Sequence, residues 1–198
     1  RSVQWAALAL QGPASRDVLA AVTDTPLDNA HFRWLSAQPI EIAGARLWAL
    51  RLSYAGELGW ELHGPADSML AVYDALWQAG TAHGIANYGS FAMNAMRMEK
   101  GFKGAGELTN EVTLPEADVM RFVNLDTGEF IGRKATLASQ QAADAGNLPW
   151  ICTYLAIDGD GISDGHGGEA VLQDGVVVGA TSSVAYGHSV GKGLAFAY

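Results

Sequence analysis

The sequence is poor in cysteine and in basic residues. Cys152 is the single cysteine among 198 residues, so the chain has no internal disulfide, no CxxC metal knuckle and no thiol redox pair. This favours a reducing compartment, and we expect the cytoplasm, or the mitochondrial matrix in a eukaryote. Only 12 Lys and Arg stand against 21 Asp and Glu, a formal net charge of −9. Because nucleic-acid binding needs clustered Lys and Arg, this balance argues against such a partner.

Long apolar runs are missing as well. No run approaches the roughly 18 to 20 residues that span a bilayer, and the first residues lack the basic region and apolar core of a signal peptide. We therefore expect a soluble protein with no membrane partner. With 49% hydrophobic and 17% charged residues, the chain has enough apolar side chains for an ordinary globular core. It begins without Met and ends inside a strand-like run at Tyr198, so we expect a trimmed piece.

Common catalytic and metal-binding motifs are also absent. The sequence has no GxGxxG, GxxxxGK[ST], HExxH or GxSxG pattern, and its five histidines are dispersed, so we expect no metal site. Asp158, Asp160 and Asp164 faintly resemble a calcium loop, but the stretch lacks the final Glu and the flanking helices of an EF-hand. We interpret it as a solvated turn.

The elements that are present alternate between strands and helices. Apolar runs and turn residues predict a buried strand over 5–10 and strands over 40–43 and 45–52, the last two joined around Gly44. Helical spacing of apolar residues predicts a helix from Ala14, a second from Pro65 to Gly80 and a third from Ser90 to Gly101. Such alternation indicates an α+β or α/β layered domain.

The composition changes between residues 138 and 149. Gln, Ala, Asp, Gly and Asn dominate there with no apolar face, and we place a domain boundary at 145/146. Beyond it, short β-type runs at 150–157, 170–173, 176–182 and 194–198 alternate with Gly- and Asp-rich turns, Asp174-Gly175 among them. This pattern is typical of a small barrel or sandwich.

Two interpretations stay open for residues 54–61, YAGELGWE. In the first, the segment is a β-hairpin with Trp60 in the core and Glu57 and Glu61 in solvent. In the second, the Glu61 carboxylate accepts two hydrogen bonds from the amino and ring N–H edge of a pterin, and Tyr54 lines the ring face. Two glycines near these residues permit a sharp bend between them.

The roles of Arg97 and of the carboxylates that follow it also stay open. Arg97 lies between methionines, so its guanidinium is semi-buried and needs either a salt bridge within the fold or a polar ligand. Glu107, Glu111 and Glu116 fit ordinary loop charges, and spacing alone does not assign them a role.

Together these segments resemble the glycine cleavage T-protein (aminomethyltransferase) superfamily across nearly the whole chain. ALQGP at 9–13, YAGELGWE at 54–61 and RMEKG at 97–101 are similar, in this order, to its LQGP turn, its Y-[TS]-G-E-x-G-[FYW]-E signature and its R-x-E-x-G helix end. The tail, 178–183 and 193–195, looks like its C-terminal barrel. The resemblance implies an α+β fold: a layered antiparallel sheet/helix folate-binding domain over 1–145, N-terminally incomplete, then a small β-barrel over 146–198.

Within the superfamily, residues 106–111 and 121–123 look most like the folate halves of dimethylglycine and sarcosine dehydrogenases. There an upstream FAD domain oxidises an N-methyl group, and the folate module captures the one-carbon unit as methylenetetrahydrofolate. The resemblance implies tetrahydrofolate as cofactor, a substrate derived from a methylated amine, and FAD only in a fused flavin domain outside this chain. A fragment of a stand-alone T-protein with a lipoyl carrier partner, and a non-catalytic scaffold beside a flavin domain, stay open as alternatives.

The resemblance also implies site residues. Tyr54 and Glu61 match positions that contact the pterin, and Arg97 matches a motif arginine at the folate pocket. The family's carboxylate near the reactive folate nitrogen lies upstream of the LQGP turn, so we expect this chain to lack it, to be incomplete as a catalyst and to contain no assignable catalytic residue. The chain departs from the family at Ala117-Asp118, where glycine is common at the second position.

Overall fold

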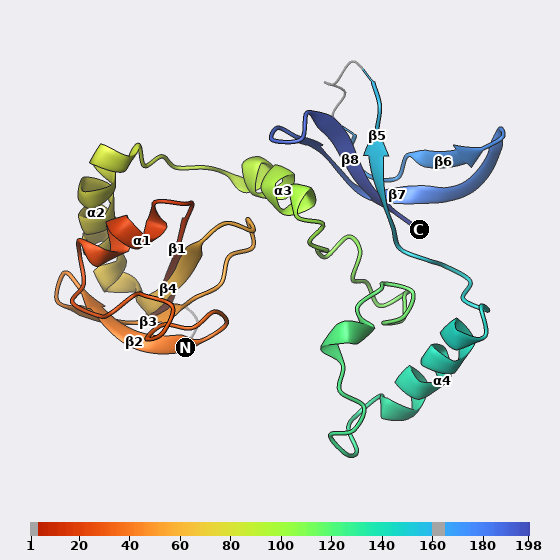
Figure 1. Ribbon diagram of the computed structural model, residues 1–198, viewed down its shortest axis with the longest axis horizontal. Coiled ribbons are helices and arrows are strands. Elements are labelled where there is room, and N and C mark those ends of the chain that lie inside the picture. Colours follow the sequence, from red (N-terminus) through yellow and green to blue (C-terminus); the bar gives the residue numbers. More distant parts are fainter. Residues whose placement is uncertain (1–3, 160–164) are drawn as a thin grey trace. The chain divides into compact units, whose positions relative to one another are not determined.

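The computed structural model describes residues 4–159 and 165–198. They form two compact units, Arg1–Met93 and Asn94–Tyr198, whose elements are drawn in Figure 1. Two aspartates of the expected solvated turn, Asp160 and Asp164, lie outside the described residues. Within the described ranges, no helix has both the length and the apolar character to cross a membrane.

The first unit is a four-stranded antiparallel sheet with two helices on one face (Figure 1). Its strand order is β1-β4-β3-β2, so β4 and β3 are central. The bounds are β1 (Trp5–Gln11), α1 (Ser15–Ala20), β2 (Ala37–Ile42), β3 (Ala45–Leu50), β4 (Gly59–Pro65) and α2 (Met69–Gly80), with a short 3-10 helix, η2 (Ala66–Ser68), before α2. The predicted alternation of strands and helices is confirmed.

The turn between β2 and β3 explains why these strands pair. Ala43 has φ 50° and Gly44 has φ 74°, the two left-handed residues that a two-residue hairpin turn of the right twist requires. Ile42 is opposite Ala45, and pairing continues to Ala37 and Leu50. The predicted pair of strands around Gly44 is confirmed.

The structure confirms a strand at residues 5–10, but the prediction that this strand is buried is wrong. β1 is a strand, but only Leu10 is buried, and Trp5, Ala7 and Ala9 are exposed. The reason is that β1 is an edge strand with one face toward the helices and one away from them, so alternate side chains remain accessible.

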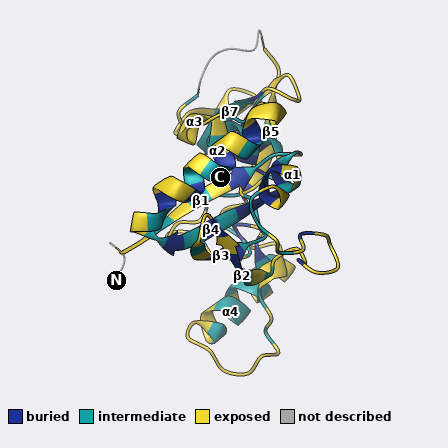
Figure 2. Ribbon diagram, turned by 90° about the vertical axis from the view of Figure 1, so that its left-hand side faces the viewer, coloured by how far each residue is buried: buried dark blue, intermediate teal, exposed yellow. Residues whose placement is uncertain are grey.

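The core of the first unit lies between the sheet and the helices. Alternating residues of the central strands face this core and are buried, whereas those on the other face are partly exposed (Figure 2). α2 contributes buried residues at helical spacing, as predicted. The largest contributors are Trp60, Leu62, Leu47, Phe32, Leu19, Val72 and Leu76. Each large apolar side chain stabilises the fold by roughly 1.5–3 kcal/mol, so β4 is held firmly from its core face.

The second unit is built on another antiparallel sheet, ordered β5-β8-β7-β6. Its bounds are α3 (Ser90–Glu99, beginning within the first unit), η4 (Met120–Phe122), α4 (Arg133–Asp144), β5 (Thr153–Ile157), β6 (Ala170–Gln173), β7 (Val176–Gly187) and β8 (Lys192–Ala197). Asp174 (φ 52°) and Gly175 (φ 79°) form the predicted hairpin turn. Met98 of α3 and Cys152 pack on buried Leu194 and Phe196 of β8.

The compact units divide the chain at Met93 and Asn94. The predicted domain boundary at 145/146 falls just after α4, and it stays a prediction.

Candidate functional site

The first two candidate residues are Tyr54, in the segment that joins β3 to β4, and Glu61, near the start of β4. Gly56 has φ 76°, a left-handed conformation that bends the chain between Tyr54 and β4. Gly59 begins β4 where a side chain is excluded, because a Cβ atom there would lie 2.7 Å from the Leu10 carbonyl oxygen of β1. The backbone conformation at Gly56 and the close approach of β1 at Gly59 therefore explain why glycine occupies both positions of GELG. Glu61 follows as the third residue of β4.

Glu61 lies on the sheet face opposite the helices. Its cross-strand neighbours are Ala9 on β1 and Leu50 on β3, so apolar side chains flank its carboxylate. Its side chain is 33% exposed, and its Oε2 atom pairs with His63 Nε2 at 3.0 Å. Tyr54, at the bend, is 38% exposed. A carboxylate that is accessible and already oriented by one partner is able to accept further N–H donors.

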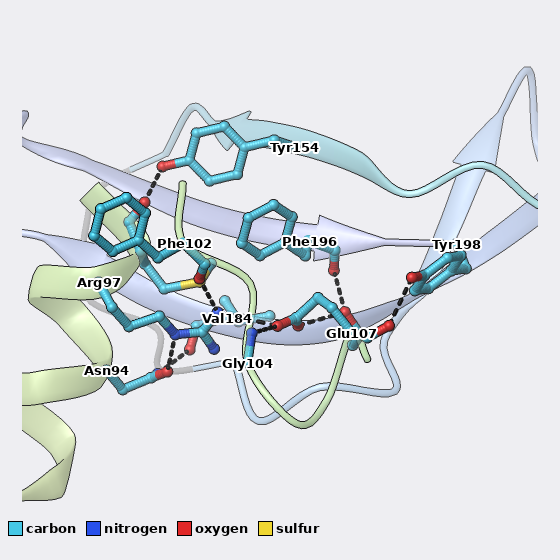
Figure 3. A network of polar contacts seen from close by, with 11 residues as sticks. Asn94, Arg97, Phe102, Gly104, Glu107, Tyr154, Val184, Phe196 and Tyr198 are labelled. Carbon is cyan, nitrogen blue, oxygen red and sulfur yellow. Dashed lines mark hydrogen bonds and ion pairs between the residues drawn. The ribbon is translucent and has the colours of Figure 1, made fainter. Parts of the chain in front are cut away.

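Arg97 belongs to the second unit and is almost wholly buried, with 5% exposure. It lies near the end of α3, where its Nε donates to Asn94 Oδ1 at 2.9 Å and its Nη1 donates to the Phe102 carbonyl at 2.8 Å (Figure 3). Nη1 also donates to Glu107 Oε2 at 3.1 Å. The salt bridge within the fold, one of the two alternatives for Arg97, is therefore formed.

Glu107 is the centre of this buried network (Figure 3). Its side chain is fully buried, and it accepts hydrogen bonds from Gly104 N and Ser182 Oγ, both at 2.7 Å. Burial alone would raise the pKa of Glu107, but hydrogen bonds from Ser183, Gly104 and Ser182 and the charge of Arg97 outweigh burial and hold that pKa below its usual value. The carboxylate is thus ionised inside the fold.

Two carboxylates that fitted loop charges in the sequence are buried instead. Besides Glu107, Glu116 is 4% exposed, and its Oε2 accepts hydrogen bonds from Thr113 N at 2.6 Å and Thr113 Oγ1 at 2.7 Å. Interpreting these two residues as ordinary loop charges is wrong, although Glu111 is exposed as expected. The Thr-x-x-Glu spacing of 113–116 was a usable signal for Glu116, since such pairs cap backbone N–H groups.

The three predicted site residues are thus divided between the units. Tyr54 and Glu61 belong to the first unit, at the two ends of one bend-and-strand segment, and Arg97 belongs to the second. Their role in binding folate stays a prediction.

Comparison with known proteins decides the family. A model of the GCVT N-terminal domain matches residues 1–127, and a model of the glycine cleavage T-protein C-terminal barrel domain matches residues 152–198. The chain belongs to the glycine cleavage T-protein family. The family resemblance inferred from the LQGP, YAGELGWE and RMEKG segments is confirmed.

Relatives of this glycine cleavage T-protein family member include dehydrogenases and an aminomethyltransferase. Human mitochondrial dimethylglycine dehydrogenase is 39% identical over 96% of this chain and 22% of its own length. Mouse mitochondrial sarcosine dehydrogenase is 37% identical over 96% of this chain and 20% of its own length. The aminomethyltransferase of Streptomyces coelicolor is 32% identical over 98% of this chain and 51% of its own. The chain therefore spans about a fifth of the dehydrogenases and about half of the aminomethyltransferase.

A solved structure confirms the fold. The glycine cleavage system aminomethyltransferase T from Bartonella henselae matches with a TM-score of 0.80, covering 98% of this chain and 51% of that one at 23% identity. The predicted α+β class, with antiparallel sheet and helices followed by a C-terminal barrel domain, is confirmed.

Proposed function

We propose that this chain is a tetrahydrofolate-binding module that captures a one-carbon unit from a methylated amine as methylenetetrahydrofolate. The observation that carries the proposal is the Glu61 carboxylate, which is ionisable, one-third exposed and held on a strand whose neighbouring residues, Trp60 and Leu62, are fully buried. A strand position fixed in this way presents its side chain with little backbone freedom.

The donors and acceptors around Glu61 fit a pterin. His63 is bonded to Oε2, and Oε1 has no hydrogen-bond partner among the described residues. Each carboxylate oxygen has two lone pairs, so Glu61 accepts the amino and ring N–H groups of a pterin while keeping His63. The apolar flanks, Ala9 and Leu50, suit an aromatic ring, and Tyr54 contributes an aromatic face with a polar tip.

Arg97 supports the proposal in a different way. Its Nη2 atom has no hydrogen-bond partner among the residues that the structure describes, so one cationic donor remains for a polar ligand atom. Its other donors are engaged by Asn94, Phe102 and Glu107, and these bonds hold the guanidinium in one orientation.

Tetrahydrofolate, when bound, supplies the nitrogen atoms that take up the one-carbon unit. The chain's own residues orient it: in the first unit, Glu61 and Tyr54 hold the ring. Acceleration of the capture then comes mainly from proximity and from electrostatics around a positively charged carbon. In this scheme no residue of the chain acts as a nucleophile.

The parent enzyme that we propose is of the dimethylglycine or sarcosine dehydrogenase type, with FAD in a fused flavin domain outside this chain. The identities of 39% and 37% to these dehydrogenases, against 32% to an aminomethyltransferase, favour this over a stand-alone T-protein. The cellular compartment stays a prediction.

Calorimetric titration of the chain with tetrahydrofolate tests the proposal. We expect Glu61→Ala to weaken binding by at least roughly 100-fold, about 3 kcal/mol, because two charge-assisted hydrogen bonds are lost. Glu41→Ala is the matched control, since Glu41 is an exposed carboxylate on β2 of the same sheet, and it should bind as the wild type does. A wild-type chain that fails to bind, or an equal loss in both variants, would contradict the proposal and favour a scaffold role.

A further inference from the structure

Two arginines of the first unit share one neutral acceptor. Arg16 on α1 donates from Nη2 to Asn29 Oδ1 at 2.9 Å, and Arg51, directly after β3, donates from Nη2 to the same atom at 2.8 Å. Both side chains are half-buried. Two guanidinium groups are therefore held side by side by a single amide oxygen that carries no charge.

Neither guanidinium has a counter-ion in residues 4–159 and 165–198. The ion pairs formed by arginines in this part of the chain are Arg97 with Glu107 and Arg133 with Glu129, and Arg16 and Arg51 form none. Half-buried like charges repel and are normally paired with carboxylates. The pair is thus a concentration of positive charge in a chain whose overall charge is −9.

Donors in the pair remain unused as well. A guanidinium carries five N–H groups, yet Arg16 makes one hydrogen bond and Arg51 makes two, the second from Nη1 to the Phe32 carbonyl at 2.5 Å. The Nε atoms of both are buried without a partner. Trp60 fixes the orientation of Arg51, whose Cζ lies 5.8 Å from the indole ring centroid. Burial and the charge of Arg16 together lower the pKa of Arg51, as expected where negative charge is lacking.

We infer that Arg16 and Arg51 form a binding site for a small oxyanion, a phosphate or carboxylate group, with Asn29 holding the two guanidinium groups together. Such groups offer two or more oxygens to the planar N–H forks of arginine, and the resulting charge-assisted bonds are strong. Arg51 contacts Trp60 on the helix-covered side of the sheet, whereas Glu61 points from the other face. The anion site is therefore separate from the proposed pterin site and does not depend on it.

Calorimetric titration of the whole chain with inorganic phosphate and, separately, with glutarate tests the site, with NaCl adjusted to constant ionic strength. We expect the wild type to bind at least one of them, and the preferred probe identifies a phosphate or a carboxylate ligand. Arg16→Gln should weaken that binding at least tenfold. Arg46→Gln, which removes an exposed arginine from β3 of the same unit, should leave it unchanged. If neither anion binds, or if both variants lose affinity equally, the inference is overturned.

A second variant keeps the test decisive if Arg16→Gln does not fold. Asn29→Asp places a carboxylate at the atom that both guanidinium groups already contact. It should supply the missing negative charge internally, weaken binding of the external anion at least tenfold, and leave the thermal unfolding midpoint unchanged or higher. Wild-type anion affinity in Asn29→Asp, or a lowered midpoint, would refute the site.

Discussion

The buried pair of Arg97 and Glu107 leads to a prediction with a large effect. Glu107→Gln keeps the shape of the side chain but removes the charge that faces Arg97, which is itself only 5% exposed. It also sets an amide N–H₂ group among the donors of Gly104 and Ser182. Removing one partner of a buried ion pair costs about 3–5 kcal/mol. Because domains are stable by only about 5–15 kcal/mol, the second unit should lose much of its stability.

The assay must report on the second unit alone. Trp150 is the single tryptophan in that unit, and the other five belong to the first, so fluorescence would mainly follow the wrong unit. Native-state hydrogen exchange resolved by segment is suitable. β8 carries four consecutive buried residues. The free energy of opening that its amide protection reports should fall by about 3–5 kcal/mol, while that of β3 in the first unit stays unchanged.

The control is Glu129→Gln. Glu129 is 91% exposed and its Oε1 atom lies 3.6 Å from Arg133 Nη1. Glu129→Gln should therefore lower the stability of the second unit by less than about 0.5 kcal/mol. A loss of less than about 1 kcal/mol in Glu107→Gln would refute the reasoning, because the buried Arg97 charge would then be tolerated without its partner.

The same residue gives a pH dependence. The pKa of Glu107 lies below its ordinary value of 4.5, so its contribution to stability is complete above pH 4.5 and is lost as the pH falls through the folded-state pKa. Wild-type β8 should therefore lose protection on acidification, and Glu107→Gln should lack this component.

Two backbone positions give further predictions. Asp118 has φ 53°, so Asp118→Gly should be more stable than Asp118→Ala by about 1 kcal/mol in urea unfolding, since only glycine adopts this conformation freely; equal stabilities would contradict the left-handed turn. A Cβ atom at Gly64 would lie 2.2 Å from Leu47 Cδ2, so Gly64→Ala should destabilise the first unit by about 1–3 kcal/mol. An unchanged midpoint of urea unfolding would contradict this, because it would mean that the Leu47 side chain moves aside without cost.

Much of the fold could be predicted because its signals are local. Gly80 ends α2 as expected, and Asp174-Gly175 joins β6 to β7 with two left-handed residues. What failed was the burial of β1, because burial depends on what covers each face of a strand and not on the apolar content of the run. The glycine that the family resemblance led us to expect at position 118 has a physical counterpart, since Asp118 adopts the conformation that favours glycine.

The partners of the candidate site residues were harder to predict. Because Arg97 was expected to be semi-buried, the sequence predicted that it needs a carboxylate or a polar ligand as partner. Which carboxylate pairs with it, Glu107 rather than Glu111 or Glu116, depends on tertiary structure. Glu107 is ten residues from Arg97 along the chain, and Ser182, another of its hydrogen-bond partners, is 75 residues away. No local sequence pattern predicts that Glu107 and Ser182 meet, because this contact arises only when β7 and β8 form.

Glu61 illustrates how a candidate binding residue is reconciled with a stable core. Trp60 and Leu62, on either side of it, are fully buried toward the helices, so the backbone of β4 cannot shift without opening the core. Alternation along the strand then leaves Glu61 and His63 together on the other face, 3.0 Å apart. The burial that stabilises one face of the strand therefore fixes the position of the carboxylate on the other, and a ligand that binds Glu61 pays little to order it.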